Sequence, residues 1–447
     1  SLSAKVHPHP LPNPMYQICL DEQFFVGIYH NDDDDTWWPC QSPTLVLLWP
    51  LWLILALMSL PTLLGWMWST CLYVRPPDVA AAEPGVLILC TGTDIAQTVE
   101  SCRLSRYRAK ILVLVVSQAD AALVEPLLGF AFSPTDPVFG FGALQAASVY
   151  TGVYGNRDES TQTLRFLVLV VRDTDTGIRR RQALIWMQGL FNRVHYNRSP
   201  DLLDIALVKA LYSQGMPVRD LQYLVCVDAP TVLHTQALRQ MVATCEDDAT
   251  ILACGSDTLL SNSRLNVWTW MQAYAVHQQV FGKQALASAL GSVSTLPGCA
   301  HMYRIASQDD KPLLSHAPVV QEFGRQDLYS VHEQHVYHDD NALTLLLLQS
   351  FPRGRVVFCP DAVGYVPAPE YLSKLCTYRQ AVRNRDLHTA YQTLRVPRAY
   401  IMKMVAVLDL LWALIGPALV GFVVYIMVRY QWVWDELGWL VPIVTGS

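Results

Sequence analysis

The sequence lacks the cysteine spacing of a structural zinc site. Its eleven cysteines are scattered over 447 residues, and no two of them are separated by only two residues. This pattern argues against a zinc cluster and against a disulfide scaffold. The chain also lacks a basic excess, because its formal net charge is -6. We therefore expect no nucleic-acid partner.

What the chain has in abundance is hydrophobic surface, at 52% of residues. Residues 44–73 contain the uncharged run LVLLWPLWLILALMSLPTLLGWMW, long enough to cross a bilayer and flanked by Trp. Residues 404–430 predict a second span, interrupted by Asp409 and kinked at Pro417. The tail, 431–447, is too short to cross alone and is interpreted as an interfacial segment or the start of a third helix.

Basic residues near the two runs predict the orientation. They follow the first run and precede the second: Arg75, Arg385, Arg395, Arg398 and Lys403. The segment between the runs should then be cytoplasmic, with the N-terminal arm, 1–43, on the opposite side. The sequence thus predicts a multi-pass membrane protein in contact with the lipid bilayer. Asp409 inside a span is easier to accommodate against protein than against lipid, which predicts other membrane-protein subunits or a homo-oligomer.

Between the spans, short apolar runs alternate with longer amphipathic stretches. The runs are VLILC from Val86, ILVLVV from Ile111, FLVLVV from Phe166, YLVCV from Tyr223 and ILAC from Ile251. Such runs, apolar on both faces, indicate an α/β domain with a mostly parallel sheet. Ligands of these sheets bind at the C-terminal ends of the strands, where Asp228 falls.

Several motifs in this region resemble, in order, those of the chitin synthases, membrane-bound family 2 glycosyltransferases. They are TVESCRLSRYRAKILVLVV from Thr98, DTGIRRRQALIW from Asp175, the strand ending at Asp228, ILACGSDT from Ile251, WTWMQAYAVH from Trp268, VSTLPGCAHMYRI from Val293, and HDDNALTLLL from His338. The resemblance implies a GT-A type, Rossmann-like domain over residues 84–390, flanked by transmembrane helices. Within it, the Arg-rich spacing of residues 371–398 favours a helix lying at the membrane interface.

The resemblance places Asp340 at the position of the family's catalytic base, with Asp339 in place of a Glu. An acceptor hydroxyl needs such a base in inverting transfer from a UDP-sugar. The alternative is structural, because acidic residues just before a helical run also stabilise a helix N-terminus. Both interpretations remain open.

The family's metal-binding Asp-x-Asp is here Asp228-Ala229-Pro230, so the second carboxylate is absent. A single carboxylate binds Mg²⁺ or Mn²⁺ weakly unless the diphosphate does most of the holding. As an alternative, Asp228 caps a turn before a helix that begins near Thr231. A pocket beside Asp228 and Asp340 that is filled by a side chain such as Arg180 would speak against metal binding.

Positions that the resemblance assigns to the donor are only partly kept. Gly177, Arg179 and Gln182 match, whereas Arg180 stands where the family has Asp, and Asp120 lies slightly beyond the expected uridine-contacting acid. An Arg cluster can grip phosphate, but it is also typical of a solvated face or a lipid-headgroup contact.

The acceptor positions implied by the resemblance are the LPGC loop and the Gln-x-x-Arg-Trp motif. In one register of the second motif Gln380 and Arg383 are kept and Asn384 replaces the Trp, whereas another register has Thr377 and Ala381 at its ends. In either register an aromatic platform for a sugar ring is missing. The implied acceptor residues are Leu296, Pro297, Gly298, Cys299, Gln380 and Arg383.

Two functions follow, and the first is favoured. In one, the chain is a catalytically inactive structural or regulatory subunit of a membrane assembly, with no cofactor. In the other, it is an active chitin synthase that transfers N-acetylglucosamine from UDP-GlcNAc to a β-1,4 glycan with Mg²⁺ or Mn²⁺. The first is favoured because the metal, donor and acceptor positions are all altered at once, and losses at separate catalytic groups accumulate.

Overall fold

A computed structural model gives the fold of the chain. It describes these residues: 28–30, 37–39, 60, 63–76, 83–92, 94–117, 120, 124, 137–139, 146–155, 163–171, 176–296, 299–325, 339–397, 400, 402–407, 410–411 and 421. Most of the two predicted spans and the tail 431–447 lie outside these residues. Within them, no helix combines the length and the apolar character needed to cross a bilayer.

The chain divides into two units, Ser1–Leu63 and Leu64–Ser447. In the first unit, strands β1 (Ile28–His30) and β2 (Trp37–Pro39) pair in antiparallel fashion. The run Asp32 to Asp35 between them lies outside the described residues.

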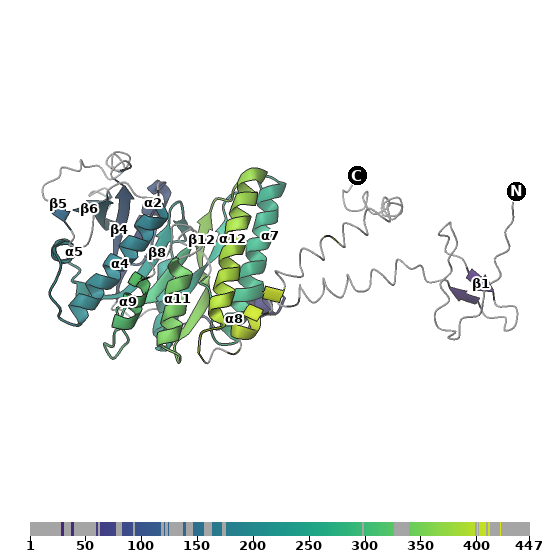
Figure 1. Cartoon of the computed structure of the whole chain (residues 1–447). Coiled ribbons are helices and arrows are strands. Elements are labelled where there is room, and N and C mark those ends of the chain that lie inside the picture. The colour runs from purple at the N-terminus through teal and green to yellow at the C-terminus, as the bar shows by residue number, and fades with distance from the viewer. Residues whose placement is uncertain are drawn as a thin grey trace. The chain divides into compact units, whose positions relative to one another are not determined.

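The second unit is built on a ten-stranded sheet (Figure 1). The strand order is β5-β6-β7-β4-β3-β8-β11-β10-β12-β9. Their bounds are β3 Gly85–Thr91, β4 Lys110–Ser117, β5 Pro137–Phe139, β6 Ala146–Tyr154, β7 Leu164–Val171, β8 Leu221–Asp228, β9 Val232–Leu233, β10 Ile251–Leu260, β11 Ala300–Arg304 and β12 Arg355–Val366.

All five apolar runs form strands, which confirms the α/β class. The block β7-β4-β3-β8 is parallel throughout, as predicted. The sheet as a whole is mixed, because β11 runs antiparallel to both β8 and β10, and β6 runs antiparallel to β7. The prediction of a mostly parallel sheet was therefore wrong outside this block and the β10–β12 pair.

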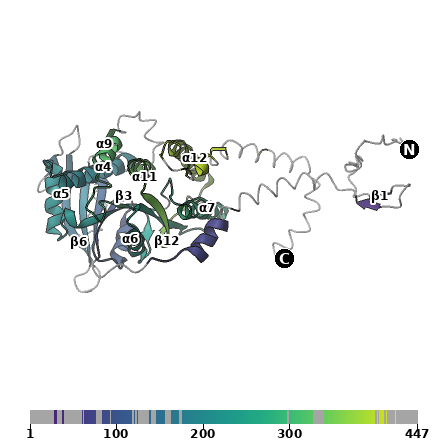
Figure 2. The ribbon, with the colours of Figure 1, turned by 90° about the horizontal axis from the view of Figure 1, so that it is seen from below.

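Helices cover both faces of the sheet, and Figure 2 shows α4, α9 and α11 on one side and α6 on the other. The helices of this α/β core are α2 Ala96–Leu104, α4 Thr176–His195, α5 Leu202–Ser213, the 3₁₀ turn η2 Val218–Asp220, α6 Ala237–Asp247, α9 Ala317–Arg325 and α11 Asp339–Ser350. Helix α5 begins at a capping box in which Asp201 and Asp204 each accept a backbone N–H.

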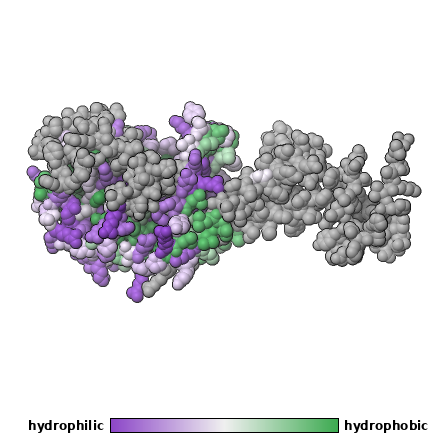
Figure 3. Space-filling view, viewed as in Figure 1, coloured by the Kyte–Doolittle hydropathy of each residue, from purple (hydrophilic) through white to green (hydrophobic). Residues whose placement is uncertain are grey.

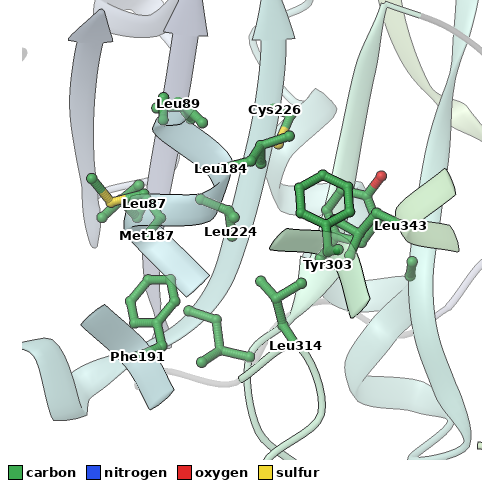
Figure 4. Packing of buried hydrophobic residues seen from close by; sticks show 14 of the residues in the cluster. Leu87, Leu89, Leu184, Met187, Phe191, Leu224, Cys226, Tyr303, Leu314 and Leu343 are labelled. Carbon is green, nitrogen blue, oxygen red and sulfur yellow. The ribbon is translucent and has the colours of Figure 1, made fainter. Parts of the chain in front are cut away.

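Alternation along the strands divides the core into two layers. On β3, Leu87 and Leu89 face the layer under α4, whereas Val86 and Ile88 face the layer under α6. Figure 4 shows the first layer, where Leu87 and Leu89 lie near Leu184 of α4. Because each strand is apolar on both faces, the sheet is buried on both sides.

A further helical group comprises the π-helix η1 (Trp68–Leu72), α7 (Val267–Gln279), the π-helix η3 (Val280–Ala285), α8 (Leu286–Ala289) and α12 (Leu372–Thr393). Helix α7 is capped by the preceding residue, Asn266, whose side chain accepts the N–H of Thr269 at 2.8 Å. Figure 3 shows hydrophobic surface gathered at one end of the domain. The described parts of the predicted spans expose Leu64, Trp66, Met67, Met404 and Val407.

Candidate functional site

Asp228 is the last residue of β8, at the C-terminal edge of the parallel block. Its side chain is 47% exposed and accepts a hydrogen bond from the Thr91 hydroxyl at 3.4 Å. Behind it, a Cβ on Gly92 would lie 2.8 Å from the Ala229 Cβ, and Gly92 has a φ of +134°. Only glycine fits this approach without strain, so the backbone of the turn after Asp228 is tightly held.

The helix predicted near Thr231 is absent. A turn closed by the Thr231 N–H and the Asp228 carbonyl leads instead into the short strand β9. Helix α6 begins only at Ala237. Val232 and Leu233 pair with β12, and this long-range pairing overrides the local helical pattern.

Asp340 lies in the first turn of α11, and its side chain is 1% exposed. The hydroxyls of Tyr303 and Thr344 lie 3.3 Å and 2.6 Å from its backbone carbonyl. The Tyr303 hydroxyl also lies 3.5 Å from Asp340 Oδ1, and His301 Nδ1 lies 3.3 Å from Oδ2. The carboxylate thus sits among polar groups from β11 and at a helix N-terminus, which favours negative charge.

Arg180 of α4 joins the two carboxylates. Its Nη1 pairs with Asp228 and its Nη2 pairs with Asp340. The Arg180 side chain is only 11% exposed. Two carboxylates from segments far apart in the chain therefore share one guanidinium, an arrangement that suits the planar fork of arginine.

Burial and the neighbouring Asp340 carboxylate raise the pKa of Tyr303 well above its ordinary value. The phenol therefore stays protonated and can donate to Asp340. Figure 4 shows Tyr303 next to Leu343 of α11, so the polar end of this ring borders the apolar layer.

The residues present do not fit the divalent ion that the resemblance implies. Both carboxylates that would face the ion already contact Arg180, and Pro230 offers no side-chain oxygen. Over the part of the chain that the structure describes, no three His, Cys, Asp or Glu side chains are placed to hold a metal.

The predicted donor residues are spread along two elements. Gly177 and Arg179 lie in the first turn of α4, where nothing is described of the Arg179 side chain, and Gln182 follows half-buried. Asp120 accepts a hydrogen bond from the Ser117 hydroxyl at 2.8 Å, just beyond β4. Asp120 thus lies near the C-terminal end of β4. The other three predicted donor residues lie on α4, the helix whose Arg180 contacts Asp228.

The predicted acceptor residues separate into buried and exposed groups. Leu296 and Cys299 belong to the core, whereas Pro297 and Gly298 lie outside the described residues. The Cys299 Sγ packs against β12 so closely that a Cβ on Gly364 would lie 2.2 Å from it. Burial raises the pKa of the Cys299 thiol to about 11, so it is a protonated packing group.

Gln380 and Arg383 lie on the exposed side of α12. Asp339 starts α11 beside Asp340, with its side chain outside the described residues. The roles assigned to these positions remain predictions.

Three buried polar residues were not singled out from the sequence, and two of them, His301 and Tyr303, lie beside Asp340. His301 and Tyr303 follow the LPGC loop on β11, and their spacing of two residues on a strand could have placed both beside one partner. Asp257 is 8% exposed on β10, and its burial raises its pKa to about 6. Its position inside an apolar strand was the available signal.

Comparison with known proteins identifies relatives. Residues 140–444, more than half of the chain, match the chitin synthase family. Chitin synthase 6 of Mycosarcoma maydis is 28% identical over 304 residues, covering 65% of this chain and 26% of the relative. Chitin synthase 5 of Verticillium dahliae is 28% identical over 362 residues, covering 76% of this chain and 20% of the relative. The chain thus spans about a quarter or less of the length of these curated relatives.

Among solved structures, a mannosyltransferase from Pyrobaculum calidifontis in complex with GDP-Man and Mn²⁺ covers 86% of this chain and 92% of its own. It is 12% identical, with a TM-score of 0.43, which is too low to argue a shared fold.

Proposed function

The chain belongs to the chitin synthase family, and we propose that it is a catalytically inactive member. In this proposal a glycosyltransferase-like domain of the GT-A type, residues 84–390, serves as a structural or regulatory subunit of a membrane assembly. The competing function is inverting transfer of N-acetylglucosamine from UDP-GlcNAc to a growing glycan.

The observation that carries the proposal is the double ion pair of Arg180. Asp228 and Asp340 are the residues that a transferase would use for the metal and for the base. The Arg180 guanidinium lies between the two carboxylates, so Asp340 already accepts a hydrogen bond from Arg180. It cannot also hold a substrate hydroxyl in the same place. General-base catalysis requires that the base lie within hydrogen-bond reach of the proton it removes.

The altered acceptor and donor positions support the same conclusion. Cys299 is enclosed against Gly364, and Asn384 replaces the aromatic platform for a sugar ring. A transferase needs several such groups placed together, because positioning supplies much of the rate enhancement. Loss of several groups leaves little basis for turnover.

Membrane attachment is part of the proposal. Exposed apolar side chains on the described ends of the predicted spans, including Trp66 and Met404, support it. The proposed topology places the domain in the cytoplasm and the N-terminal arm on the opposite side. Asp409 in the second predicted span supports packing against partner subunits or a second copy.

Calorimetry of the purified full-length chain with UDP and Mn²⁺, alongside transfer of radiolabelled N-acetylglucosamine, tests the proposal. We expect neither metal-dependent UDP binding nor transfer. Chitin synthase 6 of Mycosarcoma maydis, prepared in the same way, serves as the reference for an authentic relative. Sugar transfer by the chain above the background of a heat-treated sample would establish the competing function instead.

A further inference from the structure

Arg180 lies where a cation bound by both carboxylates would lie. We infer that Arg180 is a built-in cation that excludes divalent metal ions from this centre, and that Asp228 and Asp340 form a metal site once its side chain is removed. The inference rests on the proposed inactive centre and explains how the chain keeps that centre charge-compensated without a metal.

The geometry supports a latent site. The carboxylates contact different terminal nitrogens of the same guanidinium, so they face each other across the width of one planar group. Ions such as Mg²⁺ bind proteins through one or two carboxylates and keep several water ligands. A hydrated divalent ion therefore suits the gap that a shorter, neutral side chain would leave.

Charge explains both the exclusion and the latent affinity. A guanidinium does not lose its proton in proteins, so an arriving metal ion meets a positive charge at every usable pH. Without that charge, two carboxylates remain, and one of them, Asp340, is almost completely buried. Burying a carboxylate without a compensating positive charge is unfavourable, so the two carboxylates recruit a cation.

The surroundings provide both a route and additional polar groups. Half of the Asp228 side chain is exposed, which gives an ion access from that side. The Thr91 hydroxyl contacts Asp228, and His301 and Tyr303 flank Asp340. These groups remain in place when only residue 180 is changed.

The test compares the full chain with its Arg180→Gln variant in a Mn²⁺ titration followed by electron paramagnetic resonance. We expect the unaltered chain to leave the signal of free Mn²⁺ unchanged, and the variant to bind one Mn²⁺ per chain. The same ion should raise the unfolding temperature of the variant and not that of the unaltered chain. Adding Asp228→Asn to Arg180→Gln should abolish both effects.

Arg181→Gln is the matched control, because Arg181 is the next residue of α4 and is equally buried. Its guanidinium donates to the Phe323 carbonyl at 3.0 Å and lies 5.0 Å from the Phe323 ring centroid. This change removes a positive charge from the same helix but leaves Arg180 on its carboxylates. It should therefore produce no Mn²⁺ site.

A folded Arg180→Gln variant without bound Mn²⁺ overturns the inference. The inference is also overturned if the unaltered chain binds Mn²⁺ and the Asp228→Asn substitution abolishes that binding. This measurement does not depend on the folding of any Arg180 variant. The Arg180→Lys variant keeps the positive charge and should bind no Mn²⁺. Mn²⁺ binding by this variant also counts against the inference. Failure here leaves the proposed lack of sugar transfer intact, since that is measured on the unaltered chain.

Discussion

The parallel block of the sheet and its C-terminal edge follow different rules. In the block β7-β4-β3-β8, nearly every side chain is apolar and buried, and each strand was recognisable from its own sequence. At the edge, Asp228, Arg180 and Asp340 come from separate elements, and their meaning depends on one another. The fold is held by many interchangeable aliphatic contacts, whereas the centre depends on three charged groups.

Breaking the charged centre should have the largest effect. Arg180→Met leaves Asp340 buried without its cation and should lower the free energy of unfolding by about 3–5 kcal/mol. Denaturant unfolding followed by circular dichroism measures this loss. Adding Asp340→Asn should restore part of the stability.

Leu112→Ala is the control from the parallel block. Leu112 is fully buried, and such a truncation lowers stability by about 2–5 kcal/mol. Asp340→Asn should not relieve this loss, because Leu112 has no electrostatic link to Asp340. If the two backgrounds responded alike to Asp340→Asn, the centre would not be an electrostatic unit.

A buried carboxyl outside the centre should show a smaller, pH-dependent effect. Burial raises the pKa of Asp257 from 3.8 to about 6, so the folded chain holds this proton more tightly than the unfolded chain. Its contribution to stability is fully present below the ordinary pKa and is lost as the pH rises through about 6, a difference of up to about 3 kcal/mol. Asp257→Asn should therefore stabilise the chain at about pH 8 relative to the unaltered protein, and less so at about pH 4.

Unfolding temperatures of both proteins across this range measure the difference. The comparison between the two proteins isolates Asp257, since other carboxyls such as Asp248 titrate in both. A stability difference that does not vary with pH would show that Asp257 is not protonated in the folded chain.

The smallest effect should come from an exposed ion pair. Arg75 donates from Nε and Nη2 to Asp361 of β12, each at 3.0 Å, but the Arg75 side chain is 69% exposed. Arg75→Ala should lower stability by about 0.2–1 kcal/mol, with less effect at high salt. If Arg75→Ala lowered the free energy of unfolding as much as Arg180→Met does, solvent exposure would not explain the difference between the exposed Arg75 pair and the buried Arg180 pairs.

The sequence predicted strands that contain an unbroken apolar run of four or more residues and missed others, among them β11 and β12, that carry polar residues. In β11, buried His301 and Arg304 interrupt the apolar pattern. In β12, Pro360 and Asp361 fall within the strand, where the register with β10 shifts between the Ser256 and Asp257 pairs. Such strands are specified by their neighbours in the sheet, which a local pattern does not contain.

The site was predictable in part for the same reason. Asp228 and Asp340 were identifiable because strand ends and helix starts are local features. Arg180 was recognisable as a candidate to fill the centre, but its simultaneous contact with both carboxylates depends on how α4, β8 and α11 pack. His301 and Tyr303 were missed because their relevance arises only from β11 lying beside α11.

Among the described strands, β11 alone connects the parallel block to the β10–β12 pair. Residues Ala300 to Arg304 of β11 pair with β8, and residues His301 to Tyr303 of β11 pair with β10. During synthesis, β10 emerges well before β11 and has no partner on the β8 side until residue 304 has been made. The two halves of the sheet should therefore join late, and in hydrogen exchange the amides of β8, β11 and β10 should open as one cooperative unit.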